Sequence, residues 1–220
     1  MAQDMTDEEQ LQVLKNWWKE NGRSLMLTIF AALAAYFGWQ WWNQYQQNYA
    51  EEASRIYQEL TDAVAVQEGQ TLSDEKRSTA QFLIEQLQND YGRTLYAVNA
   101  SLLAAKMAVD QGDLNTAEQQ LKKALQQGDE DSQVIASLRL ARVYLAQEKY
   151  DLALEQAQYD KDDSFSGLFA AIRGDIFVGK GAIDDAKASY NLALEKLGAE
   201  SNLHRRMVEI KLSDLNAGNQ

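Results

Sequence analysis

The sequence predicts an all-α protein in which one N-terminal transmembrane helix is followed by a solenoid of helical repeats. Three observations support this fold class. The 220 residues include no proline, and the helix-forming residues Ala, Leu, Gln, Glu and Lys are abundant. An uncharged segment near the N-terminus is long enough to cross a bilayer. The residues that follow repeat a helix–turn–helix pattern at a nearly constant interval, as solenoids do.

Charge and composition exclude some classes of function. The chain carries 33 acidic and 21 basic residues, a formal net charge of −12. An acidic surface repels phosphate backbones, so the sequence predicts no nucleic acid partner. Because cysteine is absent, the sequence excludes a disulfide framework, a thiolate nucleophile and a cysteine-based metal site.

The segment over residues 24–50 contains no charged residue. Within it, residues 25–42 (LMLTIFAALAAYFGWQWW) include only Thr28 and Gln40 as clearly polar members. A helix of that length spans roughly 27 Å, close to the hydrocarbon thickness of a bilayer. The sequence therefore predicts a transmembrane helix over residues 24–42 that contacts the lipid bilayer.

The residues that flank this span predict its orientation. The tryptophans of the chain all lie at its two edges, where headgroups would surround them: Trp17, Trp18, Trp39, Trp41 and Trp42. Bases precede the span and acids follow it: Lys15, Lys19 and Arg23 on one side, Glu51 and Glu52 on the other. The positive-inside rule then places residues 1–23 in the cytoplasm and residues 43–220 on the opposite side.

A cleaved signal peptide is the alternative to a membrane anchor. Ala32-Leu33-Ala34 fits a small-x-small cleavage site. Cleavage there would leave a short apolar run before the cut and an aromatic-rich new N-terminus. We therefore predict an uncleaved anchor, whereas the alternative predicts a mature chain that lacks residues 1–34.

The cytoplasmic tail over residues 1–23 is expected to contain an amphipathic helix over residues 6–21. Thr6 and Glu9 have the spacing of a capping box. Apolar residues recur on one face at i, i+3 and i+7: Leu11, Leu14 and Trp18. This helix would lie against the inner leaflet of the membrane, and a frayed polar tail is the alternative.

The chain after the anchor is self-similar. The Ala-Ser-Leu triplet of residues 100–102 recurs 36 residues later at residues 136–138. The Tyr-Asp-x-Ala pattern that begins at Tyr150 recurs 33 residues later as Ile-Asp-x-Ala from Ile183. Intervals near 34 residues with a helix–turn–helix rhythm are typical of tetratricopeptide repeats. Each copy has a short polar turn between its helices: residues 111–113, 147–149 and 180–182.

The repeat domain, residues 43–220, extends beyond these three copies. Residues 51–67 and 73–89 are expected to form another helical pair, joined by a turn that contains Gly69. No helix-breaking residue separates the first of these helices from the membrane span, so the two are expected to form one helix. Residues 200–215 are expected to form the polar-faced capping helix that the end of a solenoid needs.

The motifs that could carry chemistry are weak. The chain has one histidine, His204, and a lone histidine cannot form a metal site or a nucleophile–base pair by itself. Gly179-Lys180-Gly181 lacks the upstream glycine and the following Ser or Thr of a phosphate loop. The acidic runs at 129–131 and 160–163 lack the spacing of an EF-hand. We therefore predict a protein that is not an enzyme and needs no cofactor or metal.

The order of tail, anchor and repeats resembles a known family. The N-terminal third has a basic and aromatic tail, an apolar span and an aromatic edge: Lys15, Trp17-Trp18, Glu20-Asn21-Gly22-Arg23, Gly38-Trp39 and Trp42. Degenerate repeats follow, including Leu138-Arg139-Leu140-Ala141-Arg142-Val143. Over essentially the full length, these features resemble the YfgM family of ancillary SecYEG translocon subunits.

The resemblance implies a location, partners and a role. It implies a single-pass anchor in the bacterial inner membrane and a periplasmic C-terminal domain. It implies association with the SecYEG translocon and with a PpiD-like periplasmic folding factor. It further implies chaperone-like binding of unfolded or nascent periplasmic and outer-membrane proteins. A membrane-anchored scaffold for cell-envelope assembly or regulatory complexes is the alternative, because the repeats alone predict only a protein-binding solenoid.

A protein-binding groove is expected on the concave face of the solenoid. Repeats of this kind curve so that the first helix of each pair lines that face. We register the copies on Ala105, Ala141 and Gly174. Six residues are then expected to line the groove: Asn99, Leu102, Lys106, Leu138, Arg142 and Asp175. This mixed apolar and charged lining suits extended segments of partner proteins.

Lys106 and Arg142 are two aligned cations of this groove, and in an acidic domain such cations are expected to matter more than two further acids would. They lie one repeat apart in an otherwise acidic domain. Two aligned cations in such a domain would favour partner binding, whereas the alternative is that both simply pair with neighbouring acids on the surface.

Overall fold

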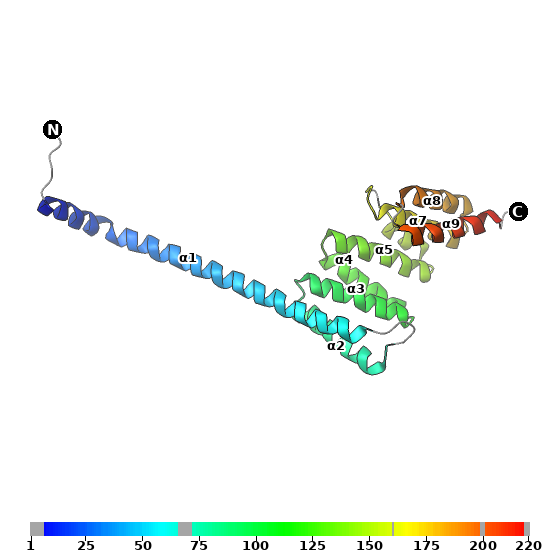
Figure 1. Cartoon of the computed structure of the whole chain (residues 1–220), viewed down its shortest axis with the longest axis horizontal. Helices are drawn as coiled ribbons and strands as arrows, with labels where there is room; N and C mark the ends of the chain where they lie inside the picture. Colours follow the sequence, from blue (N-terminus) through cyan, green and yellow to red (C-terminus); the bar gives the residue numbers. More distant parts are fainter. Residues whose placement is uncertain (1–6, 66–71, 160, 199–200, 218–220) are drawn as a thin grey trace, which may run out of the picture. The chain divides into compact units, whose positions relative to one another are not determined.

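The computed structural model describes residues 7–65, 72–159, 161–198 and 201–217, and these residues form helices and short turns (Figure 1). The all-α fold class predicted from the sequence is therefore confirmed. The helices are α1 Asp7–Val64, α2 Asp74–Asp90, α3 Leu95–Asp110, α4 Leu114–Gln127, α5 Glu130–Ala146, α6 Tyr150–Gln156, α7 Ser166–Gly179, α8 Ile183–Lys196 and α9 Asn202–Ala217.

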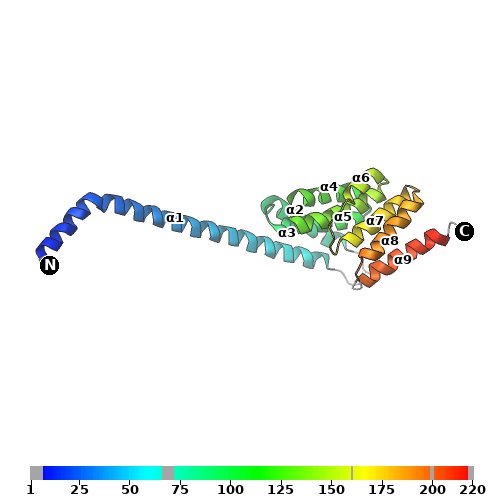
Figure 2. The same ribbon diagram turned by 90° about the horizontal axis from the view of Figure 1, so that it is seen from above.

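Helix α1 contains both the apolar segment and the first helix of the repeat domain, as predicted. The chain divides into two compact units, one that ends at Glu52 and one that begins at Ala53. Figure 2 shows that the dark blue N-terminal part of α1 is bent relative to the helix that follows it. The predicted capping residue Thr6 and the Gly69 turn lie outside the described residues.

The N-terminal unit has the properties of a membrane anchor. Helix α1 is long and apolar enough to cross a membrane, and the apolar window that meets this test has none of its residues buried. Large apolar side chains project from it on all sides, including Phe30, Leu33 and Phe37. Surrounding such side chains with lipid in place of water removes a large hydrophobic cost.

In the C-terminal unit, consecutive helices pair along the chain. Contacts join α3 with α4, α5 with α6, α7 with α8, and α8 with α9, while α5 also contacts α3 and α7. The first helices of three successive pairs therefore lie next to one another. This is the arrangement that the tetratricopeptide-like interval predicted.

Polar side chains define where several of these helices begin. Ser73, Thr94, Asp113 and Asp129 each accept a hydrogen bond from the backbone N–H three residues later, at the starts of α2, α3, α4 and α5. Such caps satisfy a backbone donor that the helix leaves unpaired. Asp129, from one of the acidic runs in the sequence, is therefore a capping residue.

The turn within each repeat uses the same backbone geometry. Gly112, Glu148 and Gly181 have φ angles of 77°, 60° and 74°. They lie in the three polar turns that the sequence predicted, at the intervals that separate the repeats. Glycine adopts this left-handed region without strain, whereas glutamate does not.

Small residues allow the paired helices to approach closely. Ala105 and Ala141, on which the first two repeats were registered, are buried, and so are Ala153 and Ala186 of the recurring Asp-x-Ala patterns. In the third repeat Gly174 takes the place of Ala105 and Ala141, and a Cβ atom at Gly174 would overlap the ring of Tyr190. The pattern of small residues in the sequence thus marks the positions where helices cross.

Candidate partner-binding surface

A pocket of about 320 Å³ lies where α3, α4 and α5 meet, and we call it the cationic pocket. It is lined by Ala105, Lys106, Val109, Leu114, Leu121, Arg139, Arg142, Val143 and Ala146. Two of the six residues predicted from the sequence, Lys106 and Arg142, therefore line one pocket. The bases stand over a wall of aliphatic side chains, so the pocket offers both positive charge and apolar surface.

The positive charges of this pocket are only weakly engaged within the chain. The Nζ of Lys106 lies 3.4 Å from Oδ2 of Asp110, and both side chains are more than half exposed, so this pair contributes little. Arg139 donates a long hydrogen bond of 3.4 Å to the backbone oxygen of Leu102. Lys106 therefore does pair with a neighbouring acid, Asp110, as the alternative supposed, but the pair is weak.

Arg142 differs from its neighbours in the pocket. Within the part of the chain that the structure describes, its guanidinium makes no hydrogen bond and no ion pair. Desolvation by the surrounding protein lowers the pKa of Arg142, although the residue as a whole keeps an exposed surface. The charge of Asp175 opposes that shift, and the like charge of Arg139 adds to it. Arginine remains protonated in any case, so the pocket holds a partly desolvated cation.

The two predicted leucines of the groove lie beneath its surface. Leu102 and Leu138 have only 7% and 6% of their surface exposed and belong to the hydrophobic core. Each precedes a pocket cation by one turn, and an aliphatic side chain at that place gains free energy by turning into the core. Asn99, on the same helix as Leu102, is half-buried.

Asp175 is held by other helices of the same chain. Its Oδ1 accepts hydrogen bonds from the Tyr190 hydroxyl at 2.7 Å and from Lys211 Nζ at 2.7 Å, and Oδ2 accepts a second bond from Lys211 at 2.8 Å. Burial and the adjacent Asp175 raise the pKa of Tyr190. This carboxylate therefore joins α7 to α8 and to the terminal helix α9.

Two residues of this region were missed by the sequence reasoning. Arg139 lines the cationic pocket one turn before Arg142, and Lys211 binds Asp175. A signal for Lys211 was present, because it follows Asp175 by the same 36-residue interval that separates the first two repeats. The place of Arg139 in the pocket depends on how α5 packs against α3 and α4.

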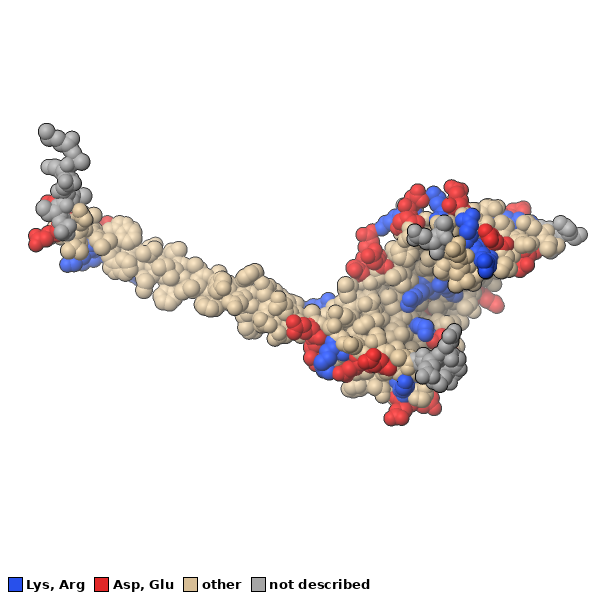
Figure 3. All heavy atoms as spheres, in the orientation of Figure 1, with Lys and Arg blue, Asp and Glu red and all other residues tan. Residues whose placement is uncertain are grey.

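Charge is unevenly distributed over the repeat unit. In Figure 3 Lys and Arg atoms lie in the middle of the visible face of the repeat unit, whereas the Asp and Glu atoms lie mainly along its edges, with other Lys and Arg atoms beside them. A concentration of positive charge within an acidic domain attracts negatively charged groups of a partner.

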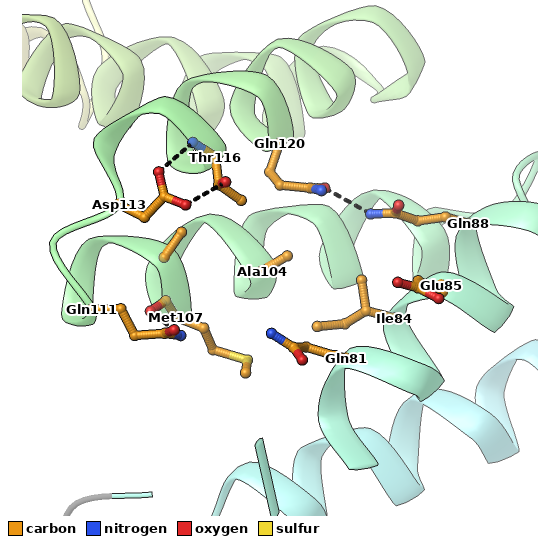
Figure 4. Close-up of a pocket in the computed structure, with 11 residues that line it drawn as sticks. Gln81, Ile84, Glu85, Gln88, Ala104, Met107, Gln111, Asp113, Thr116 and Gln120 are labelled. Atoms are coloured by element: carbon orange, nitrogen blue, oxygen red, sulfur yellow. Dashed lines mark hydrogen bonds between the residues drawn. The ribbon is translucent and has the colours of Figure 1, made fainter. Parts of the chain in front are cut away.

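A second pocket, of about 330 Å³, lies between α2, α3 and α4 and is lined by polar side chains together with Ile84, Ala104 and Met107 (Figure 4). Gln88 donates to Gln120 at 2.8 Å and accepts a bond of 2.8 Å from Lys123. Asp113 accepts two hydrogen bonds from Thr116, and these bonds lower the pKa of Asp113. Because these polar groups satisfy one another, this pocket has less capacity for a partner than the cationic pocket.

The weak chemical motifs have structural roles. Lys180 Nζ lies 2.8 Å from Asp151 Oδ1, and the adjacent Gly181 has the positive φ of an inter-helix turn. Among the described residues, no group of three or more His, Cys, Asp or Glu side chains is placed to hold a metal ion. Asp160, in the second acidic run, lies outside the described residues.

Comparison with known proteins identifies relatives over the whole chain. A Haemophilus influenzae protein is 34% identical over 98% of this chain and 100% of its own length. An Aggregatibacter actinomycetemcomitans protein is 32% identical over the same shares, and an Escherichia coli protein is 29% identical over 95% of this chain and 96% of its own. All three are named ancillary SecYEG translocon subunits.

The family assignment rests on a second comparison as well. The sequence pattern of the tetratricopeptide repeat-like domain matches residues 15–217, which include the apolar segment as well as the repeats. No solved structure matches the chain significantly. The chain therefore belongs to the tetratricopeptide repeat-like domain family, and over nearly its full length it is similar to proteins named ancillary SecYEG translocon subunits.

Proposed function

We propose that this protein is an accessory subunit of the SecYEG translocon that binds other proteins through its repeat domain. The observation that carries the proposal is the similarity to ancillary translocon subunits from one end of the chain to the other. The apolar part of α1 is the part that would reach a translocon within the bilayer, and the cationic pocket is the part that would bind soluble segments.

The membrane topology that this role requires is the one that the positive-inside rule predicts from the charges on either side of the span. Residues 1–23 lie in the cytoplasm, residues 24–42 cross the inner membrane, and residues 43–220 lie in the periplasm. An alkaline phosphatase fused after Gln220 should be active, because this enzyme folds only outside the cytoplasm. An inactive fusion in cells that make the full-length protein would contradict this orientation of the chain in the membrane. A mature mass that lacks residues 1–34 would support the cleaved alternative.

The role itself is chaperone-like and not catalytic. The repeat domain would bind unfolded or nascent periplasmic and outer-membrane proteins as they leave the translocon, together with a PpiD-like folding factor. Charged and apolar groups side by side in the cationic pocket suit segments of mixed composition. Changing Lys106 and Arg142 both to Glu should weaken capture of such segments while helical content stays the same. Unchanged capture at low and moderate salt would place the association in the anchor.

Photocrosslinking from the anchor tests the assignment to the translocon. A photoreactive phenylalanine analogue replaces Phe30 or Phe37, whose side chains are exposed in α1. The same analogue at Phe82, exposed on α2, is the matched control in the repeat unit. Translocon subunits should appear among the adducts of the first two positions.

The alternative function predicts a different set of adducts. A scaffold for cell-envelope assembly or regulatory complexes would crosslink from the anchor to subunits of those complexes and not to the translocon. Adducts of that kind, with no translocon subunit among them, would favour the scaffold.

A further inference from the structure

The cationic pocket combines three features that together specify a ligand chemistry. It holds the basic residues Lys106, Arg139 and Arg142 in a domain that is acidic overall. Its remaining lining is aliphatic. Its volume of about 320 Å³ is at the lower end of the range for ligand sites, so it suits a short segment and not a folded domain.

Asp175, the acid whose charge acts on Arg142, is hydrogen-bonded to other residues. Its carboxylate accepts hydrogen bonds from Tyr190 and Lys211. Releasing it toward Arg142 would break three hydrogen bonds that join α7 to α8 and α9. The guanidinium of Arg142 is thus left with its hydrogen-bonding groups free for a ligand, within the described part of the chain.

The apolar wall sets the second requirement. Val109 is 45% exposed, and it stands beside Leu121 and Val143, which are buried below it. An aliphatic side chain that covered Val109 would remove apolar surface from water on both partners. It would also exclude water from the bases, and charge-assisted hydrogen bonds strengthen in such surroundings.

We propose that the cationic pocket binds an extended segment of a partner protein in which a carboxylate lies beside an aliphatic side chain. The carboxylate binds Arg142, with Lys106 and Arg139 contributing positive charge, and the aliphatic side chain covers Val109. This inference rests on the proposed function, since it names the kind of segment that the repeat domain would bind.

The test uses the full-length protein in lipid nanodiscs and fluorescein-labelled glycine–serine peptides. One peptide carries a leucine–aspartate pair, a second carries leucine–asparagine, and a third carries glycine–aspartate. Fluorescence anisotropy should show that the leucine–aspartate peptide binds about tenfold more tightly than either of the other two. Its affinity should fall as salt is raised, because part of the attraction is electrostatic.

Variants of the pocket give the control. Arg142→Gln should lower the affinity for the leucine–aspartate peptide about tenfold and leave the affinity for the leucine–asparagine peptide almost unchanged. Arg93→Gln removes the same charge from an exposed turn outside the pocket and should change neither affinity. Circular dichroism of both variants checks that the helices are retained.

Each other outcome overturns the inference in a distinguishable way. One such outcome is that the aspartate and asparagine peptides bind the wild type equally and both lose binding when Lys106→Glu is combined with Arg142→Glu. That result would locate partner binding in the pocket but reject the need for a carboxylate in the ligand. Failure of all three peptides to bind would reject the inference and the pocket's part in the proposed function. Sedimentation that shows a dimer dissociated by Arg142→Gln would mean that a second copy of the chain occupies the pocket.

Discussion

The first two repeats and the third repeat place different chemistry at the same position of the fold. Lys106, Arg142 and Asp175 each follow the small residue on which the repeats are registered. In the first two repeats, α3–α4 and α5–α6, the residue is a cation that lines an open pocket. In the third, α7–α8, it is an acid bound to Tyr190 and Lys211. One position thus lines an open pocket within the solenoid and joins helices at its end.

The difference follows from what each repeat has as its neighbour. A solenoid repeat is stabilised by the repeats stacked on either side, and the last one lacks a following pair. Here the single helix α9 takes that place. Arg205 also ties it to α8, through hydrogen bonds to the backbone oxygens of Leu194 and Leu197 at 2.8 and 3.1 Å. The end of the solenoid therefore uses polar side chains that the middle can leave available for partners.

The largest effect is expected where the third repeat differs in size from the others. Gly174→Ala places a Cβ atom against the ring of Tyr190, whereas the first two repeats accept alanine at this position. Overpacking of a core typically costs about 1–3 kcal/mol, more than the helix propensity that alanine adds. Hydrogen-exchange mass spectrometry should show faster exchange in α7, α8 and α9.

Gly198→Ala is the control for this prediction, because a Cβ atom at Gly198 meets no atom within 4 Å. Equal exchange rates for Gly174→Ala and the wild type would contradict the close approach of α7 to α8.

A pH-dependent effect is expected at the boundary between the first two repeats. Glu118 on α4 lies 2.7 Å from Lys122 and 3.0 Å from Lys149, which precedes α6. The pKa of Glu118 is lowered to about 2, mainly by the hydrogen bond to Lys122 and also by the bond to Lys149, against an opposing effect of burial. Because the folded pKa lies below the unfolded value, this stability is present above about pH 4.5 and is lost as the pH falls toward about 2.

Glu118→Gln isolates that contribution from the other carboxylates. The variant should be less stable than the wild type at pH 7, and the difference in urea midpoint should shrink as the pH is lowered toward 2. If the difference in urea midpoint stayed constant between pH 7 and pH 2, the contribution of Glu118 to stability would not depend on its charge. The contact of Glu118 with the second repeat would then be one of packing only.

A smaller effect is expected when the bond between α7 and α9 is removed. Lys211→Met leaves the carboxylate of Asp175, which is only 24% exposed, with Tyr190 as its remaining partner. Since Lys211 is itself partly exposed, we expect a cost of about 1 kcal/mol. Exchange should quicken in α9 and remain unchanged in α3 and α4.

A double-mutant cycle with Asp175→Asn measures the pair directly. The two variants together should cost less than the sum of their separate costs, because each alone removes the same interaction. Additive costs would indicate that α9 is held by its apolar contacts, such as buried Val208, and not by the ion pair.

The elements of the fold that the sequence predicted are those set by local patterns. The three turns, the capping helix and the unbroken helix that continues from the apolar segment all follow from spacing and from residue type. The burial of Leu102 and Leu138 did not follow, because one helix face carries both groove and core positions. The partners of Asp175 did not follow either, because they depend on how α7 packs against α8, which carries Tyr190, and against α9, which carries Lys211.

The smallest expected effect concerns the turns, where the second repeat departs from the other two. Glu148 has a φ of 60°, and glycine occupies the equivalent places in the first and third repeats. The left-handed conformation costs a residue with a side chain about 1–2 kcal/mol, and glycine loses part of that gain through its larger unfolded-state entropy. Glu148→Gly should therefore stabilise the protein by about 0.5 kcal/mol, seen as a higher urea midpoint with an unchanged slope.

Gly112→Ala and Gly181→Ala should have the opposite effect, since each introduces a side chain at a positive φ. If Glu148→Gly lowered the midpoint as well, the side chain of Glu148 would have to contribute more than its backbone strain costs. The second turn would then differ from the other two in function and not only in residue type. That result would extend the contrast between the repeats from the groove to the turns.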